Sequence, residues 1–213
     1  MKTEKPGLPH GVYGITAEKF SRGRTNIEVV NEMIAGGISL IQYREKRPKK
    51  SVAEMYTECL AIRKLTREAG VLFIVNDFPT LALLTDADGV HVGQDDFPVP
   101  ELRSLMGADK IIGLSTHEPA HALKAVQLGA DYIGVGPIFS TQTKDDVCAP
   151  VGLGYLDFVA KQGQLPFTAI GGIKEHNLAE VIAHGAKSAC LVTEIVGADD
   201  IAGTVRRLQA FFK

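Results

Sequence analysis

The sequence predicts an α/β protein, a single (β/α)8 TIM barrel with eight parallel strands, and three observations support this fold. Short apolar runs alternate eight times with helix-like stretches along the 213 residues. Several runs are nearly continuous Val, Ile and Leu, as in strands that are buried on both faces of a parallel sheet. Glycines recur between the end of a helix-like stretch and the next strand, where glycine can close a helix.

The expected strands are 12–16, 40–42, 72–75, 89–92, 111–114, 132–135, 167–170 and 189–192. The expected helices are 26–35, 51–69, 79–84, 99–106, 119–128, 153–162, 177–183 and 199–212. An open doubly wound sheet is the alternative, but eight units and the lack of Gly-x-Gly-x-x-Gly after the first strand favour the barrel. We expect one domain over residues 1–213, with 1–10 as a flexible or capping segment.

Composition narrows the classes of function. Hydrophobic residues make up 45% of the chain and charged residues 23%, as in an ordinary globular protein. The net charge of −2 gives no electrostatic reason to expect a nucleic-acid or membrane partner. The three cysteines lack the spacing of a zinc site, and neither an apolar leader nor a membrane-spanning run is visible. We therefore expect a cytoplasmic protein with small-molecule partners.

Polar residues follow each expected strand, and in a parallel barrel these strand ends share one face. Gln42, Arg44 and Lys46 alternate at period two as the second strand ends, so all three point to one side. An amide and two cations there would suit a phosphate group. A solvated charge run is the alternative interpretation.

Acidic residues follow the next two strands. Asp77 comes directly after Asn76, and Asp96 closes the following strand. Mg²⁺ bound to a diphosphate favours a few carboxylates together with phosphate oxygens and water, so two neighbouring acidic strand ends fit such an ion. The alternative is that both residues cap the helices that follow.

The later strands offer groups for an anion. A long loop after the sixth strand holds Thr141, Thr143 and Lys144. Two hydroxyls and a lysine together are typical of an anion-binding loop, and the alternative is an ordinary surface loop. The last two strands end at Gly171-Gly172 and Val192-Thr193, where barrels often bind phosphate through backbone N–H groups. We expect His91 to be a buried, hydrogen-bonded core residue and consider His117 a weaker candidate for substrate contact.

Over nearly its whole length the chain closely resembles the thiamine-phosphate synthase family of (β/α)8-barrel enzymes, also called thiamine-phosphate pyrophosphorylases. The resemblance depends on motifs that occur in order on successive strand ends, at residues 41–46, 75–77, 87–96, 113–117, 129–139, 141–144 and 169–173. The family is expected to join 4-amino-2-methyl-5-(diphosphooxymethyl)pyrimidine to 4-methyl-5-(2-phosphooxyethyl)thiazole. The products are thiamine phosphate and diphosphate.

The resemblance also implies a role for each candidate residue. The pyrimidine diphosphate would be held by Gln42, Arg44, Lys46, Asn76, Ser115 and Lys144, and the catalytic groups among these would be Arg44, Lys46, Ser115 and Lys144. Mg²⁺ would be ligated by Asp77 and Asp96. The thiazole phosphate would be held by Thr141, Thr143, Gly172, Val192 and Thr193. Glu194, which differs from the usual family sequence, adds a negative charge beside that phosphate.

The residues fit this chemistry, because displacement of diphosphate needs no enzyme nucleophile and no nucleophile–base pair is visible in the sequence. A stabilised leaving group is sufficient, and the electron-rich aminopyrimidine could carry the positive charge in a dissociative step. Two alternatives stay open. One is a thiazole tautomerase-like barrel, which would not need diphosphate-bound Mg²⁺, and the other is a non-catalytic barrel that binds a phosphorylated metabolite.

Overall fold

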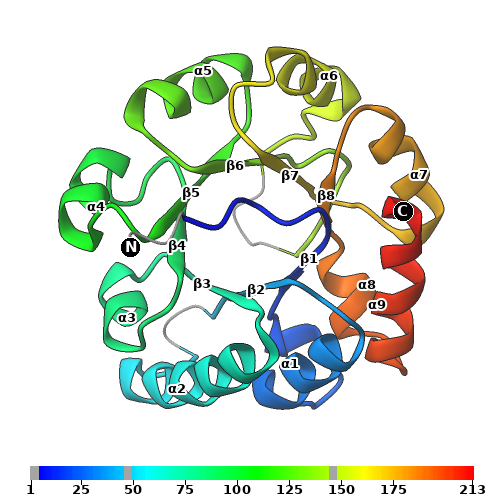
Figure 1. Ribbon diagram of the computed structural model, residues 1–213. Helices are drawn as coiled ribbons and strands as arrows, with labels where there is room; N and C mark the ends of the chain where they lie inside the picture. Colours follow the sequence, from blue (N-terminus) through cyan, green and yellow to red (C-terminus); the bar gives the residue numbers. More distant parts are fainter. Residues whose placement is uncertain (1–4, 46–48, 144–147) are drawn as a thin grey trace.

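The structure is a computed structural model that describes residues 5–45, 49–143 and 148–213 (Figure 1). Eight parallel strands form a closed barrel in chain order, and the last strand pairs with the first. Helices surround the barrel on its outer side (Figure 1). The predicted barrel is confirmed, and the open sheet is excluded. Among the described helices, none is long and apolar enough to cross a membrane.

The elements follow the predicted alternation. The strands are β1 (Gly11–Ile15), β2 (Leu40–Tyr43), β3 (Leu72–Asn76), β4 (Gly89–Val92), β5 (Ile111–Thr116), β6 (Tyr132–Val135), β7 (Phe167–Ile170) and β8 (Ser188–Cys190). The helices are α1 (Asn26–Ala35), α2 (Val52–Ala69), α3 (Pro79–Leu84), α4 (Val99–Met106), α5 (Pro119–Leu128), α6 (Gly152–Gln162), α7 (Glu175–Ala183), α8 (Val192–Val196) and α9 (Ile201–Gln209). Two 3-10 turns are η1 (Glu18–Phe20) and η2 (Ala210–Phe212).

The prediction for the last strand is wrong at its end. β8 stops at Cys190, and Val192 begins the short helix α8. Ile195 and Val196 of this helix are buried in the core, so the apolar run continues from the strand into the helix. Short apolar runs do not distinguish a buried strand from a buried helix segment. Val192 and Thr193 therefore lie in the first helical turn, not at a strand end.

Local sequence signals account for the helix boundaries. Thr25 begins α1 with a capping box, because its side chain accepts from the Glu28 backbone while the Glu28 carboxylate accepts from the Thr25 backbone. Ser51 and Glu54 repeat this arrangement at α2. At the end of α5, Gly129 takes the left-handed conformation (φ 79°), as the recurring glycines predict.

The alternation of side chains along the strands separates two apolar regions. Outward-facing side chains pack beneath the helices in one large cluster. Inward-facing side chains fill the barrel in a second cluster, made of Tyr13, Ile15, Leu40, Ile74, Ile111, Tyr132 and Cys190. Further along β2, β3 and β5 the inward positions become polar, at Gln42, Asn76 and Ser115. The barrel is therefore closed by apolar groups at its base and polar toward the carboxyl ends of its strands.

The segment before β1 crosses the amino-terminal end of the barrel (Figure 1). Leu8 packs against the inner cluster, and the Lys5 ammonium lies 2.7 Å from an Asp131 carboxylate oxygen just before β6. These two contacts hold the segment over the end of the barrel that is opposite to the polar strand ends.

Two aspartates repeat one structural role at the turns that precede β4 and β6. The Asp88 carboxylate accepts from the backbone N–H of Phe73 in β3 at 2.8 Å. It also accepts two hydrogen bonds from the Arg63 guanidinium of α2, at 2.8 and 3.0 Å. One carboxylate thus joins a strand edge, a turn and the helix that leads into the neighbouring strand.

Asp131 makes the same connection two units later. Its Oδ2 atom accepts from the backbone N–H of Ile112 in β5 at 2.7 Å and from Arg103 of α4 at 2.6 Å. The side chain is about three-quarters buried, which strengthens charge-assisted hydrogen bonds relative to a surface pair. This carboxylate–guanidinium contact therefore recurs at two of the βα units, before β4 and before β6.

We predict that Asp131→Ala lowers the free energy of unfolding by about 2–3 kcal/mol, because it leaves the Ile112 N–H and the Arg103 guanidinium without their shared acceptor. Urea denaturation of the purified variant measures this change. Asp86→Asn is the control. The Asp86 carboxylate pairs with Arg67 and Lys110 but is 65% exposed, and Asn tolerates the left-handed backbone of this residue (φ 50°), so loss of the charge should cost less than about 1 kcal/mol. Equal losses in the two variants would contradict the assigned role of Asp131.

Candidate active site

A cavity of about 750 Å³ lies at the carboxyl ends of the strands. Every strand of the barrel contributes to its lining, as does the loop that follows β6. A cavity of this size and mixed polarity is typical of a small-molecule site. The polar strand ends that are scattered through the sequence are thus gathered around one space.

Most of the predicted site residues line this cavity. The described residues of that set in the lining are Gln42, Arg44, Asn76, Ser115, Thr141, Thr143, Gly172, Val192 and Thr193. Lys46 and Lys144 lie outside the described residues. Asp77 and Asp96 do not belong to the described lining, although Asp95 does. Asp77 is half-buried directly after β3, and Asp96 is exposed in the turn after β4.

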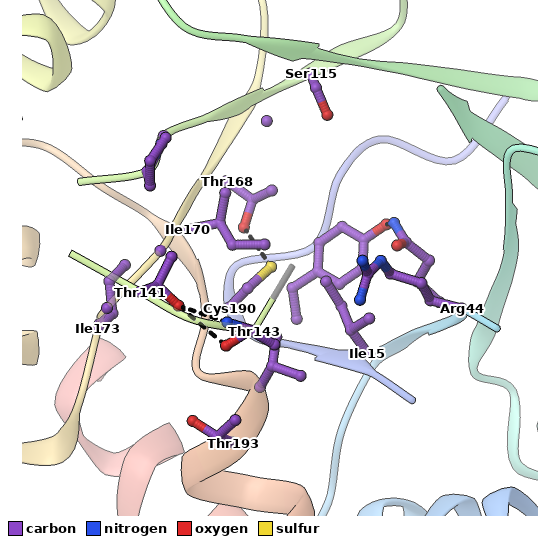
Figure 2. A pocket seen from close by; sticks show the side chains of 18 of the residues that line it. Ile15, Arg44, Ser115, Thr141, Thr143, Thr168, Ile170, Ile173, Cys190 and Thr193 are labelled. Carbon is purple, nitrogen blue, oxygen red and sulfur yellow. Dashed lines mark hydrogen bonds between the residues drawn. The ribbon is translucent and has the colours of Figure 1, made fainter. Parts of the chain in front are cut away.

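Two hydrogen bonds fix the end of β2, one to β1 and one to the residue that follows β1. The Gln42 amide is buried and donates from Nε2 to the Tyr13 hydroxyl at 2.9 Å. The Arg44 backbone N–H donates to the Thr16 hydroxyl at 2.8 Å, which sets the course of the chain as it leaves the strand. In Figure 2, Arg44 lies on one side of the cavity, and Thr141 and Thr143 lie on the other.

Hydrogen-bonded side chains cover the floor of the cavity. The Tyr13 and Tyr132 hydroxyls are 2.7 Å apart, and the Tyr132 hydroxyl is 2.8 Å from Nδ1 of His91. Nε2 of His91 is 3.0 Å from the Ser115 hydroxyl. His91 is buried and hydrogen-bonded, as predicted, but its ring faces the cavity and not a purely structural core. Burial raises the pKa of both tyrosines far above their usual value, so both phenols stay protonated.

Sequence reasoning assigned no role to Tyr13 and Tyr132. The period-two alternation of the strands contained a signal for these residues. Tyr13 lies two positions before Ile15 and Tyr132 two positions before Gly134, so each tyrosine faces the barrel interior with its neighbour. It was hidden because inward-facing and outward-facing positions of these strands are both apolar or aromatic. Gly113 of β5 makes room for the floor, since a Cβ atom there would lie 2.2 Å from Cζ of Tyr132.

Hydroxyls and a close backbone approach form the far side of the cavity. The Thr141 and Thr143 hydroxyls are 3.0 Å apart, and the Thr143 N–H donates to the Thr141 hydroxyl at 3.3 Å (Figure 2). Gly172 has φ 65°, and a Cβ atom there would come within 2.6 Å of the Ser140 carbonyl oxygen. The position therefore needs glycine both for its backbone conformation and for the contact with the loop after β6.

Lys174 is a cation at this end that sequence reasoning missed. It follows the Gly171-Gly172-Ile173 turn and lines the cavity. Its ammonium donates to the Thr193 hydroxyl at 2.9 Å and lies 3.1 Å from a Glu194 carboxylate oxygen. A cation two residues after a glycine pair at a strand end was the signal in the sequence that could have identified it.

The contacts of Glu194 explain how its charge is accommodated. One carboxylate oxygen pairs with Lys174, and the other accepts from the backbone N–H of Glu175, at the start of α7, at 3.4 Å. The carboxylate is thus compensated by a cation and by the positive end of a helix. Thr193, beside it, is held by the same lysine and stays in the cavity wall.

The acidic residues fit a magnesium ion shared with a ligand better than a site made by the protein alone. Among the described residues, no group of three or more His, Cys, Asp or Glu side chains could hold a metal ion. Asp77 and Asp96 supply hard oxygen donors on neighbouring strand ends, which suits Mg²⁺ when phosphate oxygens and water complete its shell. The Asp96 carboxylate accepts from the Gly93 N–H at 2.7 Å, which holds it over the end of β4.

Comparison with known proteins identifies close relatives. Residues 12–195 match the model of the thiamine monophosphate synthase family. The thiamine-phosphate synthase of Pelotomaculum thermopropionicum is 63% identical over 203 residues, which cover 95% of this chain and 92% of that protein. The solved structure of thiamine phosphate pyrophosphorylase from Pyrococcus furiosus has a TM-score of 0.86 and 33% identity, and the match covers 95% of each chain. A 3-hexulose-6-phosphate synthase, at 16% identity and a TM-score of 0.69, shares the fold alone.

Proposed function

The chain belongs to the thiamine monophosphate synthase family, and on this premise we propose that it is a transferase with thiamine-phosphate synthase activity. It joins the pyrimidine diphosphate to the thiazole phosphate, and it forms thiamine phosphate and releases diphosphate. The observation that carries the proposal is one cavity lined by the residues that the family motifs assign to both substrates. A cytoplasmic location stays a prediction from the sequence.

The reaction exchanges one bond for another at the methylene carbon of the pyrimidine. The C–O bond to diphosphate breaks with its electron pair on the leaving oxygen, and the thiazole nitrogen supplies the pair for the new C–N bond. In the proposed dissociative order the bond breaks first, and the aminopyrimidine ring carries the positive charge. Enzyme groups then need only to orient the ring and stabilise the leaving group.

The chain offers groups for both tasks on one side of the cavity. Gln42 and Asn76 are buried amides that can orient the pyrimidine, while Arg44 and Ser115 can donate to the diphosphate. Lys46 and Lys144 are proposed to act with them on the leaving group. Mg²⁺, held by Asp77 and Asp96, would supply further positive charge to the diphosphate.

The other side suits a single phosphate. Thr141 and Thr143 offer hydroxyls, and Gly172 allows the backbone to come close to an anion. The N–H groups of Val192 and Thr193 belong to the first turn of α8, where backbone donors have no partner within the helix. Lys174 adds a charge at the same place. A phosphate anchored here would hold the thiazole next to the pyrimidine, which favours reaction through proximity.

A two-substrate assay tests the proposal. Purified protein mixed with both substrates and Mg²⁺ should release diphosphate and form thiamine phosphate in equal amounts. Tautomerisation of the thiazole without diphosphate release would favour the tautomerase-like alternative. Binding of either phosphorylated compound without any turnover would favour a non-catalytic binding protein.

We predict that Asp77→Asn and Asp96→Asn each lower kcat by roughly 100-fold or more at limiting Mg²⁺, because the leaving group loses charge stabilisation. Steady-state rates over a Mg²⁺ titration measure the effect, and calorimetry should show unchanged binding of the thiazole phosphate. Asp95→Asn is the matched control, since Asp95 lines the cavity next to Asp96 but has no assigned role. A lower kcat in Asp95→Asn together with an unchanged kcat in Asp96→Asn would show that the wrong aspartate was assigned to Mg²⁺.

We predict that Lys174→Met weakens binding of the thiazole phosphate by about tenfold, the equivalent of one charge-assisted hydrogen bond. The variant also leaves the Glu194 carboxylate without its cation. Isothermal titration calorimetry measures the affinity, and the dephosphorylated thiazole alcohol should bind equally well to both proteins. Lys161→Met, on the exposed end of α6, is the control for loss of a surface charge. An equal loss of affinity for the alcohol would exclude a phosphate contact by Lys174.

A further inference from the structure

A continuous chain of hydrogen bonds crosses the floor of the cavity from Gln42 to Ser115. Its four links join side chains of five strands, and each is between 2.7 and 3.0 Å long. We propose that Tyr132 and His91 are positioning residues, which fix the Ser115 hydroxyl as a hydrogen-bond donor toward the diphosphate. We call this hydrogen-bonded chain the relay. The inference depends on the proposed function, because the two ends of the relay, Gln42 and Ser115, are assigned to the pyrimidine diphosphate.

The direction of the relay follows from counting its protons. The Gln42 amide nitrogen can only donate, so the Tyr13 oxygen accepts and its single proton is directed to the Tyr132 oxygen. Tyr132 then has one proton for Nδ1 of His91. A neutral imidazole carries one proton, which must therefore be on Nε2, and Nε2–H donates to Ser115.

Each proton is used once in this order. In the reverse order the Tyr13 oxygen would accept two hydrogen bonds, and its own buried proton would need a further acceptor. Buried polar groups seldom go without partners, so the forward order has the lower cost. It leaves the Ser115 proton for a group in the cavity.

The donor-to-acceptor direction of the relay matches the two ends of one substrate. At its first residue one N–H of the Gln42 amide donates to Tyr13, and this orientation directs the amide oxygen to accept from the amino group of the pyrimidine. At its last residue Ser115 accepts from His91 and can donate to a diphosphate oxygen. With the reverse polarity, Ser115 would donate to His91 and present only lone pairs to the anion, which is unfavourable.

The surroundings hold the relay in place. Tyr13 and Tyr132 are 2% exposed or less, and their raised pKa values keep both hydroxyl protons in the relay. Gly113 lies beneath the Tyr132 and His91 rings, and a Cβ atom there would be 2.5 Å from Nδ1 of His91. The rings therefore pack directly on the backbone of β5, the strand that carries Ser115.

The test measures the proton position on His91 directly. In protein labelled with ¹⁵N-histidine, long-range ¹H–¹⁵N spectra assigned with His91→Gln should show the proton on Nε2, with and without the pyrimidine diphosphate. Tyr132→Phe removes the donor to Nδ1 and should populate the other tautomer. Tyr13→Phe should keep the Nε2 tautomer, because Tyr132 can still donate.

The same variants are compared in steady-state kinetics. Tyr132→Phe should lower kcat by about tenfold, the rate equivalent of one hydrogen bond, with little change in the KM for the thiazole phosphate. Tyr13→Phe should have a clearly smaller effect. Tyr43→Phe is the matched control, since this buried hydroxyl bonds to Glu58 of α2, outside the cavity, at 2.6 Å, and its loss should leave kcat unchanged.

Two results would overturn the relay in an active enzyme. One is a proton on Nδ1 of His91 in the wild-type protein. The other is an unchanged tautomer in Tyr132→Phe together with a kcat equal to that of Tyr43→Phe. If the wild-type protein releases no diphosphate, the proposed function itself fails, whereas the tautomer measurement does not depend on turnover and separates the two failures.

Discussion

Closure of eight parallel strands is the constraint on which the site depends. Because the strands are parallel, their carboxyl ends lie on one side, and the pairing of β8 with β1 closes that side into one rim. The period-two alternation sends every second side chain into the barrel. Residues that are distant in the chain, such as Gln42 and Ser115, thereby face one cavity. An open sheet with the same strands would leave its two edge strands far apart, and no continuous floor could connect them.

The barrel interior changes in character along its axis, and the change follows the cost of burying polar groups. Leu8 and the inner apolar cluster seal the amino-terminal end, while the proposed ligand-binding groups lie at the open rim. Between them lie hydroxyl, amide and imidazole groups that are buried too deeply for water to solvate freely. Each must find a protein partner, and the Tyr13–Tyr132–His91 contacts supply those partners. The relay is thus the boundary layer between a dry base and a polar cavity.

The alternation of strand and helix and the polar strand ends are local patterns. They were sufficient to predict the barrel, and nine of the predicted site residues line its cavity. Contacts across the barrel were not predictable in this way. Nothing local shows that Tyr132 meets His91, since their distance is set by closure and by the missing side chain at Gly113. The helix α8 was missed because burial of Ile195 resembles burial of a strand residue. Lys174 was missed because its role depends on Glu194 of another unit.

In the proposed site the balance of charge would differ between the two ends of the cavity, and this difference would sort two anionic substrates. At the end with Arg44, the proposed Mg²⁺ would add positive charge, which would suit a diphosphate that must leave with its added electron pair. At the other end, Lys174 is already paired with Glu194, so hydroxyls and backbone N–H groups would provide much of the attraction for a phosphate. That environment suits a single phosphate that stays bound and unchanged during the reaction. In this proposal the carboxylate of Glu194 limits the positive charge at this end of the cavity, so the more highly charged diphosphate would gain less from binding here in place of the single phosphate.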